Sequence, residues 1–270
     1  MTSKVDHILE NAKAENRAVL YEHEAKIICM EYGVDTPRFQ LADSPGEAVE
    51  AAERLGYPVV LKVVSPHVTH KSDVGGVLVN LKNPEEVKTG FEVVAANLRR
   101  YASKAEFKGV LVQKMAPPGL ELIIGSLADP QFGPTVMLGM GGLYVELYRD
   151  VSFRIAPINK EDAEEMIEEL KASKILKGYR RQPRLDIGAI VDALVKVSNL
   201  TARYEGVIEQ LDLNPVLVYE KGLQAVDARI ILKSSTSTSR WNELFSTVHL
   251  KALNRKNTSQ IRYQHTIIKY

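Results

Sequence analysis

The sequence predicts an α+β protein, and three observations lead to this class. Short apolar runs typical of strands follow one another in hairpin-like pairs. Helical patterns are interspersed among them without the regular strand–helix alternation of a doubly wound sheet. The length of 270 residues is enough for two or three small subdomains around a sizeable core. Hydrophobic residues make up 45% of the chain and charged residues 26%, which is ordinary for a soluble globular protein.

The composition also argues against several classes of function. The net charge of +1 gives no reason to expect a nucleic-acid partner, and no apolar run approaches the length of a membrane span. The first residues, "MTSKVDHILENAKAENR", contain no signal-peptide core. A single cysteine, Cys29, permits no intrachain disulfide and favours a reducing compartment. We therefore expect a cytoplasmic protein that binds neither nucleic acid nor membrane.

Helical periodicity predicts five helices. Residues that commonly begin or end helices support three of them. Gly56 follows the second helix, Asn83 caps the third with Pro84 in its first turn, and Asp186 caps the last. The predicted helices cover residues 17–32, 46–56 and 84–101, and two more contain residues 163–170 and 187–197.

Apolar runs of a few residues predict the strands. The run "YPVVLKVV" is almost continuous, which is typical of a strand buried on both faces, whereas "VSFRI" alternates like a half-buried strand. The segment "APPG" joins two strands, and the glycine cluster "GMGG" follows another. The predicted strands are residues 57–64, 76–81, 109–115, 120–125, 135–139 and 151–155, with two or three more between residues 206 and 232.

The composition changes at residue 233. Residues 233–270 hold seven Lys or Arg, one Glu and eleven Ser or Thr, with no Gly or Pro. All 17 glycines and all 12 prolines lie before this point. We place a boundary here and treat residues 233–270 as a basic, Ser/Thr-rich tail with no assigned role.

Lys62 stands in the middle of the apolar run "PVVLKVV". A lysine in a doubly buried strand needs an anionic partner or a lowered pKa. The alternative is an edge strand from which the lysine stem reaches solvent. The next loop, "SPHVTHKSDVGG" (residues 65–76), carries His67 and His70 with a lysine and an aspartate, although a lone histidine is more often structural. This charged loop favours a phosphate partner for Lys62.

Polar residues in the later strands are candidates for nucleotide and metal binding. Asp212 and Asn214 alternate in "LDLNP" and so point to one side of a strand, and Asp227 in "AVDARI" is expected on the neighbouring strand. Hard oxygen ligands suit a Mg²⁺ ion that also holds nucleotide phosphates, although "NP" is equally typical of a surface turn. Glu121 either takes ribose hydroxyls or faces solvent. The "GMGG" glycines (residues 139–142) either cradle a phosphate with their amides or form a plain turn.

The order of these pieces resembles the ATP-grasp superfamily. "EAKIICMEYGVDTPRF" and "EAVEAAERLGYPVVLKVV" resemble its N-terminal half, "LVQKM…ELIIG" its adenine hinge and ribose site, and "LDLNP…AVDARI" its magnesium site. Within the superfamily, "SPHVTHKSDVGGV", "MLGMGGLYVELYRDVSFRIAP" and the closing strands resemble the β subunit of ADP-forming acetyl-CoA synthetase. That subunit is the ATP-grasp half of the NDP-forming acyl-CoA synthetases, which are related to succinyl-CoA synthetase. The resemblance runs from about residue 10 to about residue 232 and does not include the tail.

The resemblance implies an ATP-grasp fold in which two α+β subdomains clamp a nucleotide. The expected divisions are an N-terminal helical segment (1–25), an N-terminal subdomain (26–108) with the loop 65–76, a C-terminal subdomain (109–232) and the tail (233–270). For ADP or ATP, the resemblance implies that Lys62 contacts the phosphates and Glu121 the ribose. The backbone of Gln113, Lys114 and Met115 is implied to contact the adenine edge. Gly141 and Gly142, with Glu146, are implied to lie at the phosphate or docking face. The residues implied to hold Mg²⁺ are Asn214 and Asp227.

The resemblance also implies a phosphoryl relay. His70 matches the family's phosphoryl carrier, with His67 as the second choice, and Asp212 orients the incoming phosphohistidine or assists the metal. Imidazole is a competent nucleophile near neutral pH. The implied reaction is acyl-CoA + ADP + phosphate ⇌ carboxylic acid + CoA + ATP. The CoA site and a first phosphohistidine then belong to a partner α subunit in an α2β2 assembly, and no GxGxxG motif for CoA appears in this chain.

Two alternatives differ in class from this enzyme subunit. The chain could be a nucleotide-binding regulatory subunit without catalysis, which the intact set of Lys62, Asn214 and Asp227 argues against. It could instead be a stand-alone ATP-dependent carboxylate ligase that works through an acyl phosphate. The "HKSD" segment of the loop argues against the second alternative.

Overall fold

The structure of the protein is a computed structural model, and it describes residues 3–68, 70–141, 150–180 and 183–233. The chain forms two compact units, each of which is considered by itself. Unit 1 consists of the described parts of Met1–Glu31, Asp35–Pro118 and Gln224–Arg229. Unit 2 consists of the described parts of Tyr32–Val34, Gly119–Leu223 and Ile230–Tyr270. The predicted tail lies outside the described residues from residue 234 onward.

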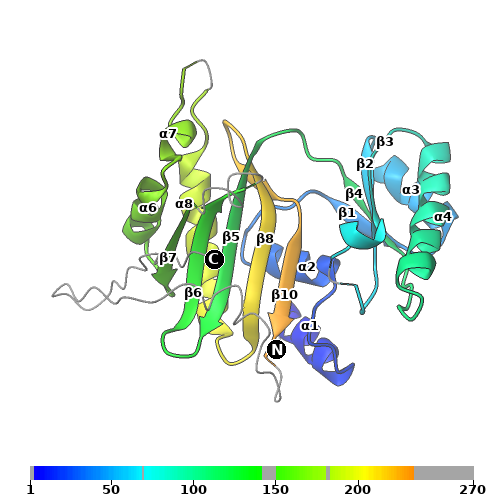
Figure 1. Cartoon of the computed structure of the whole chain (residues 1–270), viewed down its shortest axis with the longest axis horizontal. Coiled ribbons are helices and arrows are strands. Elements are labelled where there is room, and N and C mark those ends of the chain that lie inside the picture. The colour runs from blue at the N-terminus through cyan, green and yellow to red at the C-terminus, as the bar shows by residue number, and fades with distance from the viewer. Residues whose placement is uncertain (1–2, 69, 142–149, 181–182, 234–270) are drawn as a thin grey trace, which may run out of the picture. The chain divides into compact units, whose positions relative to one another are not determined.

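Unit 1 is built on a four-stranded antiparallel sheet in the order β1-β4-β2-β3. Helices α3 and α4 pack against this sheet, as Figure 1 shows, and their apolar faces form the core with the sheet. The elements are α1 (Lys4–Ala14), α2 (Glu22–Glu31), β1 (Phe39–Ala42), α3 (Pro45–Leu55), β2 (Val59–Val63), the short 3-10 helix η1 (Ser72–Val74), β3 (Val77–Leu81), α4 (Pro84–Tyr101) and β4 (Val110–Lys114).

Local sequence signals account for the ends of these helices. The Ser44 side chain accepts a hydrogen bond from the Glu47 amide at the start of α3, and the Asn83 side chain accepts one from the Glu86 amide at the start of α4. A proline occupies the first turn of both helices. Gly56 ends α3 at a φ of 80°, a conformation that favours glycine. The predicted roles of Gly56, Asn83 and Pro84 are therefore confirmed, whereas the Ser44 cap was not predicted.

Unit 2 contains an antiparallel sheet in the order β10-β8-β5-β6-β7, with β9 beside β8. Helix α8 lies against β5 and β6, and α6 lies against β7 and α8 (Figure 1). The elements are β5 (Leu120–Asp129), β6 (Gly133–Met140), β7 (Val151–Ile155), α6 (Lys160–Glu169), α7 (Ser173–Leu176), α8 (Ile187–Arg203), β8 (Ile208–Val218), β9 (Leu223–Ala225) and β10 (Ala228–Leu232). As predicted, Asp186 caps α8.

Several predicted boundaries differ from the structure. Strand 109–115 was expected in the C-terminal subdomain, but β4 pairs with both β1 and β2 and belongs to unit 1. The first predicted helix begins at Glu22 rather than at residue 17, and the expected division after residue 25 falls inside α2. None of the helices in the described parts of the chain has the length and apolar character needed to cross a membrane.

Strand β7 alternates as predicted, but its polar side chains are the buried ones. Ser152 is 4% exposed and Arg154 is 2% exposed. The Ser152 hydroxyl donates to Glu169 over 2.6 Å, and the Arg154 guanidinium donates to both oxygens of the same carboxylate over 2.9 Å. A carboxylate from α6 therefore allows the strand to bury its polar face.

The loop 65–76 returns to the sheet through its two glycines. The Val63 amide donates to the Gly76 carbonyl and the Gly76 amide donates to the Lys71 carbonyl, both over 2.7 Å. A methyl group on Gly76 would lie 2.5 Å from Val63 Cγ1 and 2.9 Å from the Lys71 carbonyl oxygen. The second glycine is therefore required where the backbone of the loop packs against β2.

We predict that Gly76→Ala lowers the free energy of unfolding by about 1–3 kcal/mol, because the added methyl group would overlap the buried Val63 side chain and the Lys71 carbonyl. Urea unfolding followed by circular dichroism measures this. The control is Gly46→Ala in α3, where an added methyl group meets nothing within 4 Å and helix propensity should add roughly 0.5–1 kcal/mol. A Gly76→Ala protein as stable as the parent would contradict the packing argument.

Candidate functional site

Lys62 lies in the centre of unit 1. All five residues of β2 are buried, and β2 lies between β4 and β3, so it is not an edge strand. The Lys62 ammonium is 2.6 Å from Glu22 Oε1 and donates to the Val226 carbonyl over 3.0 Å. Of the two interpretations of this lysine, the structure confirms the buried one with an anionic partner.

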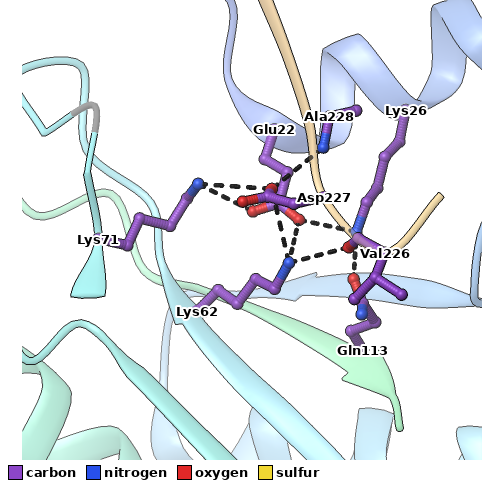
Figure 2. Close-up of polar contacts among 8 residues, drawn as sticks. All are labelled: Glu22, Lys26, Lys62, Lys71, Gln113, Val226, Asp227 and Ala228. Carbon is purple, nitrogen blue, oxygen red and sulfur yellow. Dashed lines mark hydrogen bonds and ion pairs between the residues drawn. The ribbon is translucent and has the colours of Figure 1, made fainter. Parts of the chain in front are cut away.

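The Glu22 carboxylate binds three lysines at once (Figure 2). Lys26, one helical turn later, lies 2.7 Å from Glu22 Oε1, and Lys71 of the loop lies 3.0 Å from Glu22 Oε2. The side chains of Glu22 and Lys26 are 3% and 0% exposed, and that of Lys71 is 17% exposed. We call Glu22, Lys26, Lys62, Lys71 and Asp227 the ion cluster, and all five residues belong to unit 1.

Asp227 is the second carboxylate of the ion cluster. Its Oδ1 lies 3.5 Å from the Lys62 ammonium and 3.8 Å from the Lys71 ammonium. Its own backbone segment, just before β10, also supplies the Val226 carbonyl that accepts from Lys62. The segment Gln224–Arg229 therefore belongs to unit 1 although it follows the main strands of unit 2.

Burial and the neighbouring charges shift the pKa values of the ion cluster in different directions. Burial alone would raise the pKa of Glu22, but Lys62, Lys26 and Lys71 hold it well below its usual value. Burial and the Lys62 charge lower the pKa of Lys26 to about 8 despite the Glu22 carboxylate. Burial would also lower the pKa of Lys71, but Glu22 and Asp227 together outweigh this and raise it. Burial raises the pKa of Asp227, Lys62 opposes the shift and Glu22 adds to it.

The predicted adenine segment lies beside this cluster on β4. The Gln113 side chain is fully buried and accepts a hydrogen bond from the Lys26 ammonium. The Lys114 and Met115 amides donate to the carbonyl oxygens of Arg38 and Pro58 over 2.8 and 3.1 Å. The Lys114 ammonium donates to the carbonyls of Gly56 and Tyr57. The two amides are thus already used as donors, so a base-edge contact at this segment falls to its carbonyl groups or to the residues that follow.

The two histidines of the loop have different surroundings. His67 is exposed, and its Nδ1 accepts a hydrogen bond from the Glu106 amide over 3.4 Å. His70 is also exposed and directly precedes Lys71 of the ion cluster. Asp73 lies in η1, and no hydrogen bond joins it to His70 in the part of the loop that the structure describes, which omits residue 69. The geometry thus gives His67 a structural contact and leaves the His70 side chain at the surface.

On unit 2, the structure changes the interpretation of the glycine cluster. Glu121 is exposed on β5, and its carbonyl accepts a hydrogen bond from the Gly141 amide over 2.8 Å. A side chain on Gly141 would collide with the Glu121 backbone at 2.9 Å. The Gly141 amide is therefore not a free donor for phosphate, and close strand packing explains this glycine. Gly142 and Glu146 lie outside the described residues.

Asp212 and Asn214 share one face of β8, as the alternation predicted. Both alternate with Leu211 and Leu213, which are 1% and 0% exposed, and Asn214 is exposed. They belong to unit 2, whereas Asp227 belongs to unit 1. Within the described ranges, the structure contains no group of three or more His, Cys, Asp or Glu side chains that could hold a metal ion.

Glu22, Lys26 and Lys71 have no role among the residues predicted from the sequence. Glu22 and Lys26 occur in a helix with several charged residues, a pattern typical of a solvated face. The available signal was the Glu-to-Lys spacing of four residues, which favours an ion pair on a helix. That this pair is buried depends on contacts with Lys62, 40 positions away from Glu22.

Comparison with known proteins agrees with this geometry. The family described as an ATP-grasp domain matches residues 11–232. The β subunit of the ADP-forming acetate–CoA ligase I of Pyrococcus furiosus is 49% identical over 230 residues, which are 85% of this chain and 98% of that subunit.

Solved structures of acetyl-coenzyme A synthetase 1 from Ca. Korarchaeum cryptofilum are also similar. The structure of that protein with coenzyme A, Ca-AMPCP and HgCl⁺ has a TM-score of 0.82 at 52% identity and covers 84% of this chain and 99% of its own. A second structure of that protein contains coenzyme A and Mg-AMPPCP, with its phosphohistidine segment pointing towards the nucleotide-binding site. That structure has a TM-score of 0.75 at 49% identity and covers 85% of this chain and 100% of its own.

The fold therefore defines an ATP-grasp protein, as predicted. Over nearly the whole length of its relative, this chain belongs to the family of the β subunits of ADP-forming acetate–CoA ligases. The resemblance stated from the sequence motifs is confirmed.

We predict that Glu22→Gln lowers the free energy of unfolding by about 3–5 kcal/mol at neutral pH, because it leaves buried ammonium groups without their anion. The pKa of Glu22 is depressed in the folded protein, so its stabilising contribution exists above its ordinary value of 4.5 and is lost as the pH falls through the folded pKa. The difference between parent and variant should therefore narrow in acid. Urea unfolding at neutral pH and at a series of pH values below 4.5 measures this difference.

The matched control is Glu31→Gln, on the same helix. Glu31 pairs with Lys4 at 3.1 Å, but the two side chains are 43% and 61% exposed. An exposed pair of this kind contributes at most about 1 kcal/mol. Equal losses in the two variants would show that the buried carboxylate has no special role in stability.

Proposed function

We propose that this chain is the nucleotide-binding β subunit of an ADP-forming acyl-CoA ligase and transfers a phosphoryl group between phosphohistidine and ADP. The observation that carries this proposal is the ion cluster, in which Lys62, Lys71 and Asp227 lie together and Lys71 directly follows His70. Neutralising lysines beside a histidine are the groups that phosphoryl transfer needs. The net reaction is acyl-CoA + ADP + phosphate ⇌ carboxylic acid + CoA + ATP.

His70 acts as the phosphoryl carrier in this proposal. A neutral imidazole nitrogen attacks the phosphorus of an incoming phosphohistidine, the phosphorus–nitrogen bond to the donor breaks, and the donor imidazole leaves. A β-phosphate oxygen of ADP then attacks the same phosphorus, the bond to His70 breaks, and ATP forms with His70 regenerated. The exposure of His70 supports this role, because the group must meet both a donor and ADP. Asp212 orients the incoming phosphohistidine or assists the metal.

The nucleotide contacts in this proposal are those that the family resemblance implies. Lys62 neutralises phosphate oxygens, Glu121 takes the ribose hydroxyls, and the carbonyl groups of the segment that ends at Met115 take the adenine edge. Glu121 is exposed on its strand, which supports its contact with a ligand. Each of these contacts fixes the nucleotide for in-line transfer.

Asp227 and Asn214 are the residues that we propose as ligands of Mg²⁺. The Asp227 carboxylate is 39% exposed, and both residues offer the hard oxygen atoms that Mg²⁺ prefers. Mg²⁺ commonly takes one or two protein oxygens and completes its shell with water and phosphate oxygens. When bound, it would offset the charge on the nucleotide phosphates.

A CoA-binding α subunit is the partner in this proposal, and we propose an α2β2 assembly. The partner supplies the acyl-CoA site and the first phosphohistidine. The Pyrococcus relative is named a β subunit, which supports the existence of such a partner. In this proposal the partner subunit determines the specificity for the acyl group.

We predict that Mg-ADP raises the melting temperature of this chain by mass action. A hundredfold excess over Kd stabilises by about 2.7 kcal/mol, which is roughly 5–10 °C for a protein of this size. Lys62→Met and Asp227→Asn should each reduce the shift, measured against the same variant without nucleotide by differential scanning fluorimetry. The exposed Lys88 of α4 provides the control Lys88→Met, which should keep the full shift. If Mg-ADP leaves the melting temperature of the parent protein unchanged, the proposed nucleotide site is refuted.

We predict that His70→Ala still binds Mg-ADP but forms no ATP from acetyl-CoA, ADP and phosphate in the presence of the α subunit. His67→Ala should cost much less, because His67 accepts a structural hydrogen bond. With labelled phosphate, acetyl-CoA and the α subunit, label should appear in this chain as an acid-labile, base-stable adduct that His70→Ala lacks. ATP formation by His70→Ala near the parent rate would leave the partner's histidine as the sole carrier.

A further inference from the structure

The charges of the ion cluster do not balance. Three ammonium groups, from Lys26, Lys62 and Lys71, face two carboxylates, from Glu22 and Asp227. Buried charges are tolerated when each has a partner of opposite sign. The excess of positive charge among these five described residues therefore favours an anion, and a phosphate group is the anion that the proposed reaction supplies.

Lys71 is the lysine of the cluster best placed to accept that anion. Its side chain is 17% exposed, whereas those of Lys62 and Lys26 are 6% and 0% exposed. It is held by both carboxylates, at 3.0 Å from Glu22 Oε2 and 3.8 Å from Asp227 Oδ1 (Figure 2). The Lys71 carbonyl accepts the Gly76 amide, so the loop backbone at this residue is fixed to the end of β2.

Glu22 has a positioning role towards Lys62 and Lys71. Its Oε1 lies 2.6 Å from the Lys62 ammonium, and its Oε2 lies 3.0 Å from the Lys71 ammonium. One carboxylate thus binds two like charges, although one comes from a strand and the other from a loop. Cations that are already in place need no reorganisation when a charged group arrives.

We propose that Lys71 is a second phosphate-binding lysine beside Lys62, and that Glu22 is the positioning residue that holds the two ammonium groups together for the terminal phosphate of the nucleotide. This rests on the proposed function as a nucleotide-binding subunit. Because Lys71 directly follows His70, the same contact fixes the loop beside the residue that carries the phosphoryl group. Lys26, fully buried on Gln113 and Glu22, remains a structural member of the cluster.

The test measures the affinity for Mg-ADP and for AMP by isothermal titration calorimetry, on the complex of this chain with its α subunit. Lys71→Met should weaken the affinity for Mg-ADP by about tenfold or more, because a charge-assisted contact of this kind contributes that much to binding. AMP, which lacks the terminal phosphate of ADP, should be affected much less. Lys71→Arg should recover part of the loss, and the exposed Lys88→Met should match the parent.

The role of Glu22 is tested by combining variants. In a Glu22→Gln background, the further effect of Lys71→Met on Mg-ADP affinity should be several-fold smaller than in the parent, because the loop lysine is no longer held beside Lys62. If Glu22→Gln does not fold, Glu22→Asp, which keeps the charge on a shorter stem, replaces it in the same cycle. Fully additive effects would overturn the positioning role of Glu22.

The remaining outcomes separate this inference from the proposed function. If the parent complex binds no Mg-ADP, the proposed function fails and this inference fails with it. If the parent binds Mg-ADP but Lys71→Met keeps the parent ratio of ADP to AMP affinity, the inference alone is overturned. If Lys71→Met weakens the affinities for Mg-ADP and AMP equally, the inference is also overturned, because Lys71 would then only stabilise the loop.

Discussion

The carboxylate of Glu22 is the group on which the interior of unit 1 depends. It lies within 3.0 Å of three lysine ammonium groups, one from its own helix, one from β2 and one from the loop that follows β2. A buried lysine needs an anionic partner or a lowered pKa, and the combined charge of these three lysines keeps the Glu22 pKa well below its usual range. A single negative charge thus connects three segments of the chain.

The same cluster connects the segment Gln224–Arg229 to strand β2 of unit 1. Lys62 donates to the Val226 carbonyl and lies 3.5 Å from Asp227, so the segment before β10 closes onto β2. The chain leaves unit 1 after Pro118 and comes back at Gln224. The charges of the ion cluster therefore join residues of unit 1 that are far apart in sequence.

An interior with more lysines than carboxylates is suited to an anion of high charge. Two solved structures of one relative contain nucleotide analogues, and in one of them the phosphohistidine segment points towards the nucleotide-binding site. In this chain the loop that begins after β2 carries His70 and Lys71 side by side. In the proposed function, the carrier His70 and the adjacent cation Lys71 combine nucleophile and charge stabilisation in two consecutive residues, which a glycine-rich loop of the same length could not do.

The sequence by itself determined the α+β class, most strands and helices, and the common face of Asp212 and Asn214, because each follows from local periodicity. It left open whether Lys62 is buried or lies in an edge strand, and the place of β2 between β4 and β3 decided this. It did not reveal Glu22 or Lys71 as members of the site. A charged residue in a helix or loop has the same local pattern whether it is solvated or buried. Only the tertiary structure, by bringing opposite charges together in the interior, decided that these residues are buried.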